Sequence, residues 1–153
     1  MPPITSTKKP ASIRLVALNY LARRDYARAE LAQKLLAKKF PTNEIEALLN
    51  ELTQNNSLND LRFAENYCRY RRTKGYGPLR IAMELQARGI AAEVIAEVVQ
   101  ITDNAWLIEA QNTWRKRFKA KAATDFSLLA KQMRFLQYRG FTREQIDYAV
   151  GKL

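Results

Sequence analysis

Two clusters of basic side chains have the clearest capacity for chemistry in this sequence, and that chemistry is the binding of anions. The first cluster falls between residues 62 and 80 and the second between residues 115 and 121. An exposed helix face explains any single arginine equally well, but uncompensated like charges repel, so each cluster as a whole favours binding. The candidate anion-binding residues, for nucleic acid or an acidic protein surface, are Arg62, Arg69, Arg71, Arg72, Lys74, Arg80, Arg115, Lys116, Arg117, Lys119 and Lys121.

Two tryptophans, Trp106 and Trp114, precede the second cluster. Aromatic side chains next to basic ones are typical of proteins that bind single-stranded nucleic acid, where bases stack on the rings. In a helical chain, two large aromatic residues at this spacing are more often part of the core. Both interpretations stay open at this point.

The composition excludes much enzyme chemistry. The chain has no histidine, one cysteine (Cys68) and five glycines, so it lacks the residues for a Ser-His-Asp triad, a Cys-rich zinc site or a glycine-rich phosphate loop. Its acidic residues are not paired at a spacing that suits acid–base or two-metal catalysis, and we expect Glu65, Glu84, Glu93 and Glu97 to lie on solvated helix faces, with Asp60 as a helix N-cap. We therefore predict a protein that is not an enzyme and that uses no cofactor and no catalytic metal.

Net charge and hydropathy limit the possible partners and the possible cellular compartment. The 153 residues include 26 Lys and Arg against 15 Asp and Glu, a formal net charge of +11, which indicates an anionic partner. No apolar run of about 18 residues is present, so we expect no membrane-spanning helix. Residues 1–12 contain no apolar signal core and are predicted to be a disordered tail. The single thiol favours the reducing cytoplasm.

Apolar residues recur at helical spacing along almost the whole chain. Ile13, Ala17, Tyr20 and Leu21 fall on one face of a predicted helix with Ser12 as its N-cap. No stretch alternates polar and apolar residues as a half-buried strand does. The sequence therefore predicts an all-α fold.

An internal repeat of about 50 residues organises these helices. Leu35, Lys38, Phe40 and Ile45 align with Leu85, Arg88, Ile90 and Ile95, and these align with Leu136, Arg139, Phe141 and Ile146. The pattern describes a helix with a basic last turn, then an apolar residue that packs back, then another helix. We predict three tandem three-helix repeats, at residues 13–55, 58–101 and 104–152.

Cap residues support these helix ends. Gly89 and Gly140 stand where a left-handed residue would end a helix, and Asn56 stands where one would close the first repeat. Thr142 and Gln145 have the spacing of a capping box that opens the last helix. Local residue chemistry and the repeat thus agree on the helix boundaries.

The motifs resemble those of a known family. The segments that carry the resemblance are Asp60-x-Arg62-Phe63-Ala64, then Arg71-x-x-Lys74-Gly75-Tyr76-Gly77-Pro78-x-Arg80-Ile81, then Phe135-Leu136-x-x-Arg139-Gly140-Phe141. They are similar to the signature of the RecX family, bacterial regulators of the RecA recombinase. Asn59 stands where the family often has Asp, and Asn56 where it often has Gly, so the departures concern local cap geometry.

The resemblance implies a partner and an activity. It implies an elongated, curved array of helical repeats in the cytoplasm, which binds in the groove of the RecA–single-stranded DNA filament. It further implies negative modulation of filament extension, ATP hydrolysis and strand exchange, in DNA repair, recombination and the SOS response. We expect a monomer. The alternative is a stand-alone basic module that competes for single-stranded DNA.

Overall fold

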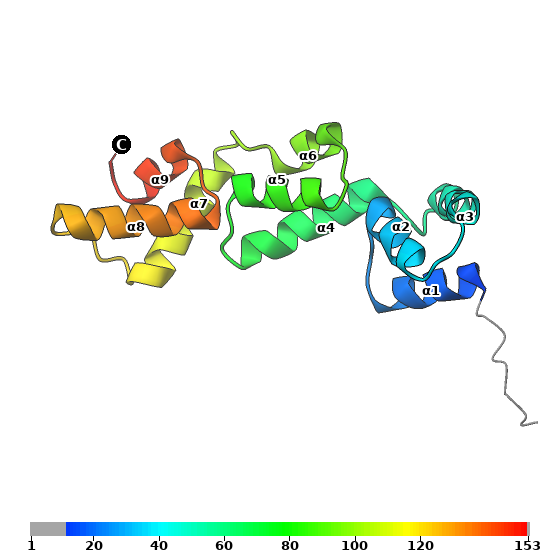
Figure 1. Ribbon diagram of the computed structural model, residues 1–153. Helices are drawn as coiled ribbons and strands as arrows, with labels where there is room; N and C mark the ends of the chain where they lie inside the picture. The colour runs from blue at the N-terminus through cyan, green and yellow to red at the C-terminus, as the bar shows by residue number, and fades with distance from the viewer. Residues whose placement is uncertain (1–11, 153) are drawn as a thin grey trace, which may run out of the picture. The chain divides into compact units, whose positions relative to one another are not determined.

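The computed structural model describes residues 12–152, which form nine α-helices and no strand, so the all-α prediction is confirmed (Figure 1). The helices are α1 Ile13–Arg23, α2 Arg28–Ala37, α3 Thr42–Gln54, α4 Asp60–Thr73, α5 Pro78–Ala87, α6 Ala92–Val99, α7 Ala105–Phe118, α8 Phe126–Arg139 and α9 Arg143–Ala149. They fall in threes within 13–55, 58–101 and 104–152, which we propose as the repeat boundaries. The tail predicted for 1–12 lies outside the described residues, except for Ser12, whose hydroxyl accepts a hydrogen bond from the Leu15 N–H at 3.1 Å.

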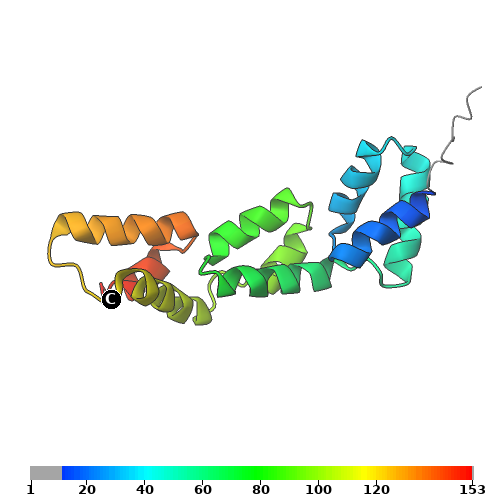
Figure 2. The same cartoon turned by 90° about the horizontal axis from the view of Figure 1, so that it is seen from below.

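The chain divides into two compact units, of which the first ends at Asp60. In this unit α1, α2 and α3 pack against one another in pairs (Figure 2). Leu48 and Leu52 of α3 lie four residues apart on one face and are buried together with Leu35 of α2, because an apolar stripe of this period must face the core. The Asp60 carboxylate accepts a hydrogen bond from the Arg28 N–H at 2.8 Å, at the start of α2.

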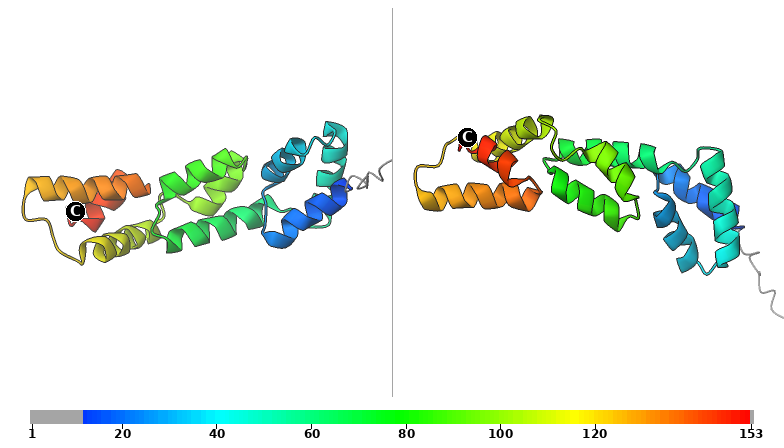
Figure 3. Two further views of the ribbon diagram at one scale, coloured as in Figure 1. Left: turned by 60° about the horizontal axis from the view of Figure 1, so that its bottom comes forward. Right: turned by 90° about the horizontal axis from the view of Figure 1, so that it is seen from above.

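The second unit begins at Leu61 and contains most of α4 together with α5 to α9. Helices α5 and α6 lie beside α4, and α7 packs along α9 with α8 against both (Figure 3). Trp106 and Trp114 are buried in this unit, and their indole N–H groups donate to Val99 O and to Gln132 Oε1, each at 2.9 Å. The two tryptophans are therefore core residues, and the interpretation that they stack on nucleic-acid bases is wrong.

The predicted caps have the expected geometry. Asn56, Gly89 and Gly140 have φ angles of 65°, 79° and 96°, and Thr142 forms the capping box with Gln145. The position that corresponds to Gly89 in the first repeat holds Lys39, which adopts φ 68°. A residue with a side chain in this left-handed region costs about 1–2 kcal/mol. The helix end in the first repeat is therefore less stable than those of the other two repeats, which have glycine there.

Few side chains outside the basic clusters suggest chemistry. Cys68 is buried, and burial raises the pKa of its thiol against the opposing charges of Arg72 and Arg69. Within residues 12–152, no three His, Cys, Asp or Glu side chains lie close enough together to hold a metal ion. Over that same range, no helix is both long and apolar enough to cross a membrane.

Candidate polyanion-binding site

Two glycines bring the turn between α4 and α5 into main-chain contact with the end of α8. The Gly77 N–H donates to the Arg139 carbonyl at 2.7 Å, and the Leu79 N–H donates to the Gly140 carbonyl at 2.9 Å. A Cβ atom on Gly77 would lie 2.5 Å from the carbonyl carbon of Gly140, and one on Gly140 would lie 2.3 Å from Cβ of Arg80. We call this pair the glycine contact. It requires glycine on both sides because any side chain would push the two main chains apart.

The ring of Tyr76, beside the glycine contact, is surrounded by arginines from three helices. The guanidinium carbons of Arg71, Arg80 and Arg139 lie 3.7, 4.6 and 4.9 Å from the ring centre. Guanidinium groups are attracted to aromatic faces, and partial burial strengthens that attraction. Tyr76 therefore joins α4, α5 and α8, and two of the predicted binding arginines help to hold these helices together.

Glu84 compensates part of the first basic cluster. Arg71 donates Nε to Glu84 Oε1 at 2.9 Å and Nη2 to Oε2 at 2.8 Å, with only 19% and 20% of the two side chains exposed. Arg80 Nε lies 3.7 Å from the same carboxylate. Burial by itself lowers the pKa of Arg71, but the bonds to Glu84 and its charge outweigh that effect and raise the pKa. The prediction that Glu84 lies on a solvated face is wrong, because its side chain is mostly buried against Arg71 of α4 and Arg80 of its own helix.

Two other members of the first cluster, Arg72 and Lys74, meet part of the second cluster around one hollow of about 450 Å³, which we call the basic pocket. Its cationic side chains are Arg72, Lys74, Lys116, Arg117 and Arg139. The carboxylate of Glu109 also lines it, 3.8 Å from the Arg72 guanidinium. A hollow with five cations and one carboxylate has a positive potential that attracts phosphates or acidic protein surface.

Helix ends and ring contacts place these cations. Lys116 and Arg117 lie in the last turn of α7, where positive charge complements the helix dipole. Arg72 lies over the Trp106 ring at 4.4 Å from its centre, and Arg139 donates to the carbonyl of Lys74 at 2.9 Å. Lys74 and Lys116 are exposed, so their ammonium groups are available to a partner.

Sequence reasoning missed Arg139. The available signal was the internal repeat, which puts a basic residue at the end of the second helix of each repeat, at Arg139 as at Arg88. The prediction used this position only as a helix-end marker. Its role in the basic pocket depends on the glycine contact, which brings the end of α8 next to the α4–α5 turn.

The remaining predicted binding residues do not line the basic pocket. Arg69 is exposed and donates to Asn66 Oδ1 at 3.0 Å, and Arg62 is half-buried near the start of α4. Arg115, Lys119 and Lys121 are exposed at and beyond the end of α7. The structure thus places four of the eleven predicted residues at one site, and two more, Arg71 and Arg80, in the supporting contacts beside it.

The fold and the site together define a helical-repeat protein with basic side chains gathered on its second unit. Comparison with protein families gives the same division into threes: residues 14–52, 59–99 and 109–150 match the first, second and third three-helix domains of RecX. The chain belongs to the RecX family.

Relatives and solved structures agree with this assignment. Regulatory protein RecX of Legionella pneumophila (strain Corby) is 42% identical over 131 residues, covering 86% of this chain and 87% of the relative. That of Halorhodospira halophila is 40% identical over 140 residues, covering 92% and 87%. The crystal structure of RecX from Lactobacillus salivarius superposes with a TM-score of 0.78 at 22% identity, covering 92% of this chain and 94% of that one, and shares the fold. The chain is thus a regulatory protein of the RecX type.

Proposed function

We propose that this protein binds the RecA–single-stranded DNA filament as a monomer in the cytoplasm and lowers recombinase activity in DNA repair and recombination. It acts by binding rather than by catalysis, and it slows filament extension, ATP hydrolysis and strand exchange. Membership of a family of regulatory proteins supports the regulatory role. The basic pocket supports the choice of a polyanionic nucleoprotein partner, and it is the single observation that carries this proposal.

The pocket suits a partner with closely spaced negative charges. Lys74 reaches it from the turn after α4 and Lys116 from α7, so one phosphate or carboxylate between them gains from both charges. Arg71 and Arg80 act as positioning residues, since their partners within the chain are Glu84 and the Tyr76 ring. The exposed residues Arg115, Lys119 and Lys121 add positive charge at and beyond the end of α7, and Arg62 and Arg69 lie farther from the pocket, along α4.

ATP hydrolysis by the recombinase tests the proposal. The purified chain is added either with the nucleotide and DNA, so that filaments are nascent, or after filaments have formed. We expect the hydrolysis rate to fall in both cases, and to fall faster with nascent filaments because new subunits are blocked at the growing end. An unchanged rate in both cases, at chain concentrations equal to the recombinase, would refute the proposal.

The five cations of the basic pocket also suit a second candidate function, which is competition for bare single-stranded DNA. A salt titration separates the two. If pocket cations neutralise four phosphates, log K for a bare oligonucleotide falls with log salt at a slope of about −3. If the chain acts by competing for bare DNA, it inhibits the recombinase only when its concentration is near or above its Kd for bare DNA. Inhibition at much lower concentrations means that the chain acts on the filament.

A further inference from the structure

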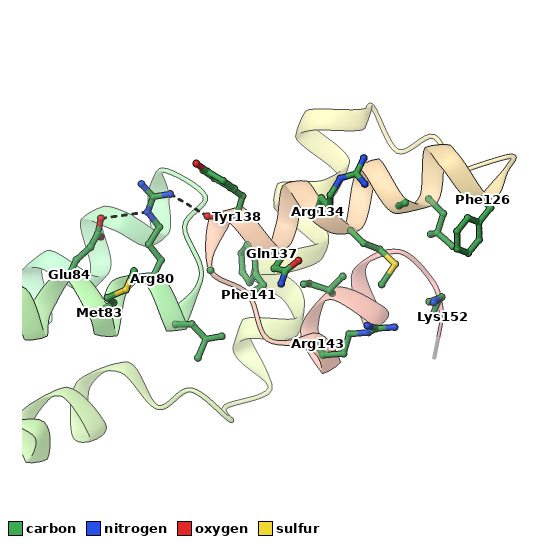
Figure 4. A pocket seen from close by; sticks show the side chains of 16 residues that line it. Arg80, Met83, Glu84, Phe126, Arg134, Gln137, Tyr138, Phe141, Arg143 and Lys152 are labelled. Carbon is green, nitrogen blue, oxygen red and sulfur yellow. Dashed lines mark hydrogen bonds and ion pairs between the residues drawn. The ribbon is translucent and has the colours of Figure 1, made fainter.

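A large apolar groove lies between α5, α8 and α9 in the second unit. Its volume is about 1000 Å³, and none of its lining residues belongs to the basic pocket. Figure 4 shows Met83 reaching it from α5, Gln137 from α8 and Arg143 from α9. A groove of this size lies at the upper end of the range for small-molecule pockets, and it is long enough to seat several apolar side chains of a macromolecular partner.

The groove exposes one apolar face of α8. Phe126, Leu129, Ala130 and Met133 line it at helical spacing, together with Met83 from α5. Phe126 is 85% exposed and Met83 is 64% exposed. Apolar residues at this period normally pack against a neighbouring helix, and within unit 2 this part of α8 is left open to solvent.

The rim of the groove is positively charged. Arg80, Arg134, Arg143 and Lys152 line it, against the single carboxylate of Glu84. Arg71 and Arg80 already compensate Glu84, and Arg143 pairs with Asp147 at 3.0 Å. For Arg134, no carboxylate lies within ion-pairing distance among residues 12–152. The groove thus combines an apolar floor with a surplus of positive charge.

We propose that this groove binds an amphipathic helix of a partner protein, with an apolar ridge on the groove floor and acidic residues against the rim. Helix-in-groove recognition uses such anchors at i, i+3, i+4 and i+7, and methionines adapt to different ridges. The net charge of +11 disfavours a second copy of this chain as the occupant. The exposed rings of Phe126 and Tyr138 also line the groove, so stacking of nucleic-acid bases is the competing outcome that the test below includes. This proposal goes beyond the proposed function and does not depend on the recombinase.

The methionines provide a specific reporter. The chain has three, of which Met83 and Met133 line the groove. The full chain is labelled with ¹³C at the methionine methyl groups and titrated with a synthetic peptide of about 18 residues, long enough to form a helix on binding. This peptide carries leucines on one face and glutamates on the other. Matched probes are the same peptide with lysines in place of the glutamates, and oligo(dT) of similar length.

We expect the acidic peptide to shift the Met83 and Met133 methyl signals, while the lysine peptide and oligo(dT) shift neither. The variant Arg134→Glu/Arg143→Glu should weaken binding by about tenfold or more. Arg115→Glu/Lys121→Glu makes the same charge change away from the groove and should bind as the unmodified chain does.

Three results would overturn the proposal. They are the absence of shifts with the acidic peptide, equal binding of the two peptides, and shifts of the groove methionines with oligo(dT). None of these readouts involves recombinase activity, so failure here leaves the proposed function untouched, and failure of the proposed function leaves this surface untouched.

Discussion

The two basic clusters both lie in the second unit but have different surroundings. In the first, Arg71 and Arg80 share Glu84 and lie over the Tyr76 ring. In the second, Arg115, Lys116 and Lys119 are exposed at the end of α7. A run of like charges therefore does not indicate by itself how many charges are available to a partner. The carboxylates and rings that lie next to the basic side chains in the fold decide that number.

The two kinds of basic side chain have different roles, because some stabilise the fold and others are exposed to a partner. Arginine forms forked bonds to carboxylates and stacks on rings, so it suits the partly buried positions of the first cluster. Lysine keeps a hydrated, mobile ammonium group, and Lys74 and Lys116 lie at the exposed edge of the basic pocket. We infer that the arginines Arg71 and Arg80 hold the helices that position the lysines. Substitutions of these arginines should therefore change the free energy of unfolding, and substitutions of these lysines should change the affinity for a partner.

The largest expected effect concerns the glycine contact that supports the first cluster. Gly140→Ala should lower the free energy of unfolding by on the order of 4 kcal/mol, because the new Cβ would meet the main chain and Cβ of Arg80 in a left-handed conformation. Urea unfolding followed by tryptophan fluorescence measures this directly, since Trp106 and Trp114 both lie in the second unit.

Gly75→Ala is the matched control for that substitution. Gly75 also has a positive φ, of 83°, but its Cβ would meet only side-chain atoms, with the Arg139 guanidinium nearest at 3.3 Å. The expected loss is about 1 kcal/mol, from backbone strain alone. Equal losses for the two variants would mean that the close approach at Gly140 does not exist in solution.

A smaller effect separates the clusters themselves. Arg71→Ala should cost about 2 kcal/mol of unfolding free energy, because it leaves the mostly buried Glu84 carboxylate without its two-pronged partner while Arg80 remains nearby. Arg115→Ala should stay within about 0.5 kcal/mol of the unmodified protein, since its side chain is exposed. Chemical unfolding of the two variants side by side measures the difference. Equal losses of unfolding free energy in the two variants would contradict the claim that the first cluster stabilises the fold and the second does not.

The smallest effect is on the pH dependence of stability. Burial raises the pKa of Cys68 above its ordinary value of 9.0, although Arg72 and Arg69 oppose the shift. The folded state therefore holds this proton longer, so the stabilisation is complete below about pH 9 and is lost as pH rises through the folded pKa. Unpaired arginines next to the thiol would instead lower its pKa and reverse the sign.

Unfolding free energies measured between about pH 8 and about pH 10 test that sign. The unmodified protein should lose stability with rising pH, by less than about 1.4 kcal/mol per pH unit from this group. Cys68→Ala should lose less over the same range, with Tyr67, whose pKa burial also raises, accounting for part of the remainder. A steeper loss in the Cys68→Ala variant would contradict the assignment.

Much of the fold could be predicted from local chemistry. The caps at Asn56, Gly89 and Gly140 and the capping box at Thr142 depend on residues within one helix turn, so their types and spacing were sufficient. The internal repeat predicted that the helices are grouped in threes, because the same sequence pattern occurs three times along the chain. These features need no knowledge of which helices meet.

The candidate site was predicted only in part, because it depends on contacts between distant segments. The pairing of Arg71 with Glu84 crosses from α4 to α5, and the place of Arg139 in the basic pocket follows from the glycine contact. The residue types indicate the charges but not their compensation, so Arg71 and Arg80 are predicted as binding residues together with Lys74. The motif Lys74-Gly75-Tyr76-Gly77-Pro78 does not reveal that Gly77 and Tyr76 join three helices.

The most direct test of the central claim compares two charge-reversed variants in the recombinase ATPase assay. Lys74→Glu/Lys116→Glu reverses the exposed lysines of the basic pocket, and Lys34→Glu/Lys131→Glu changes the net charge equally at exposed positions outside it. With helical circular dichroism unchanged in both, the pocket variant should need at least about tenfold more protein for half-inhibition, while the control inhibits as the unmodified chain does. Equal inhibition by the two variants would contradict the claim that this pocket contacts the filament.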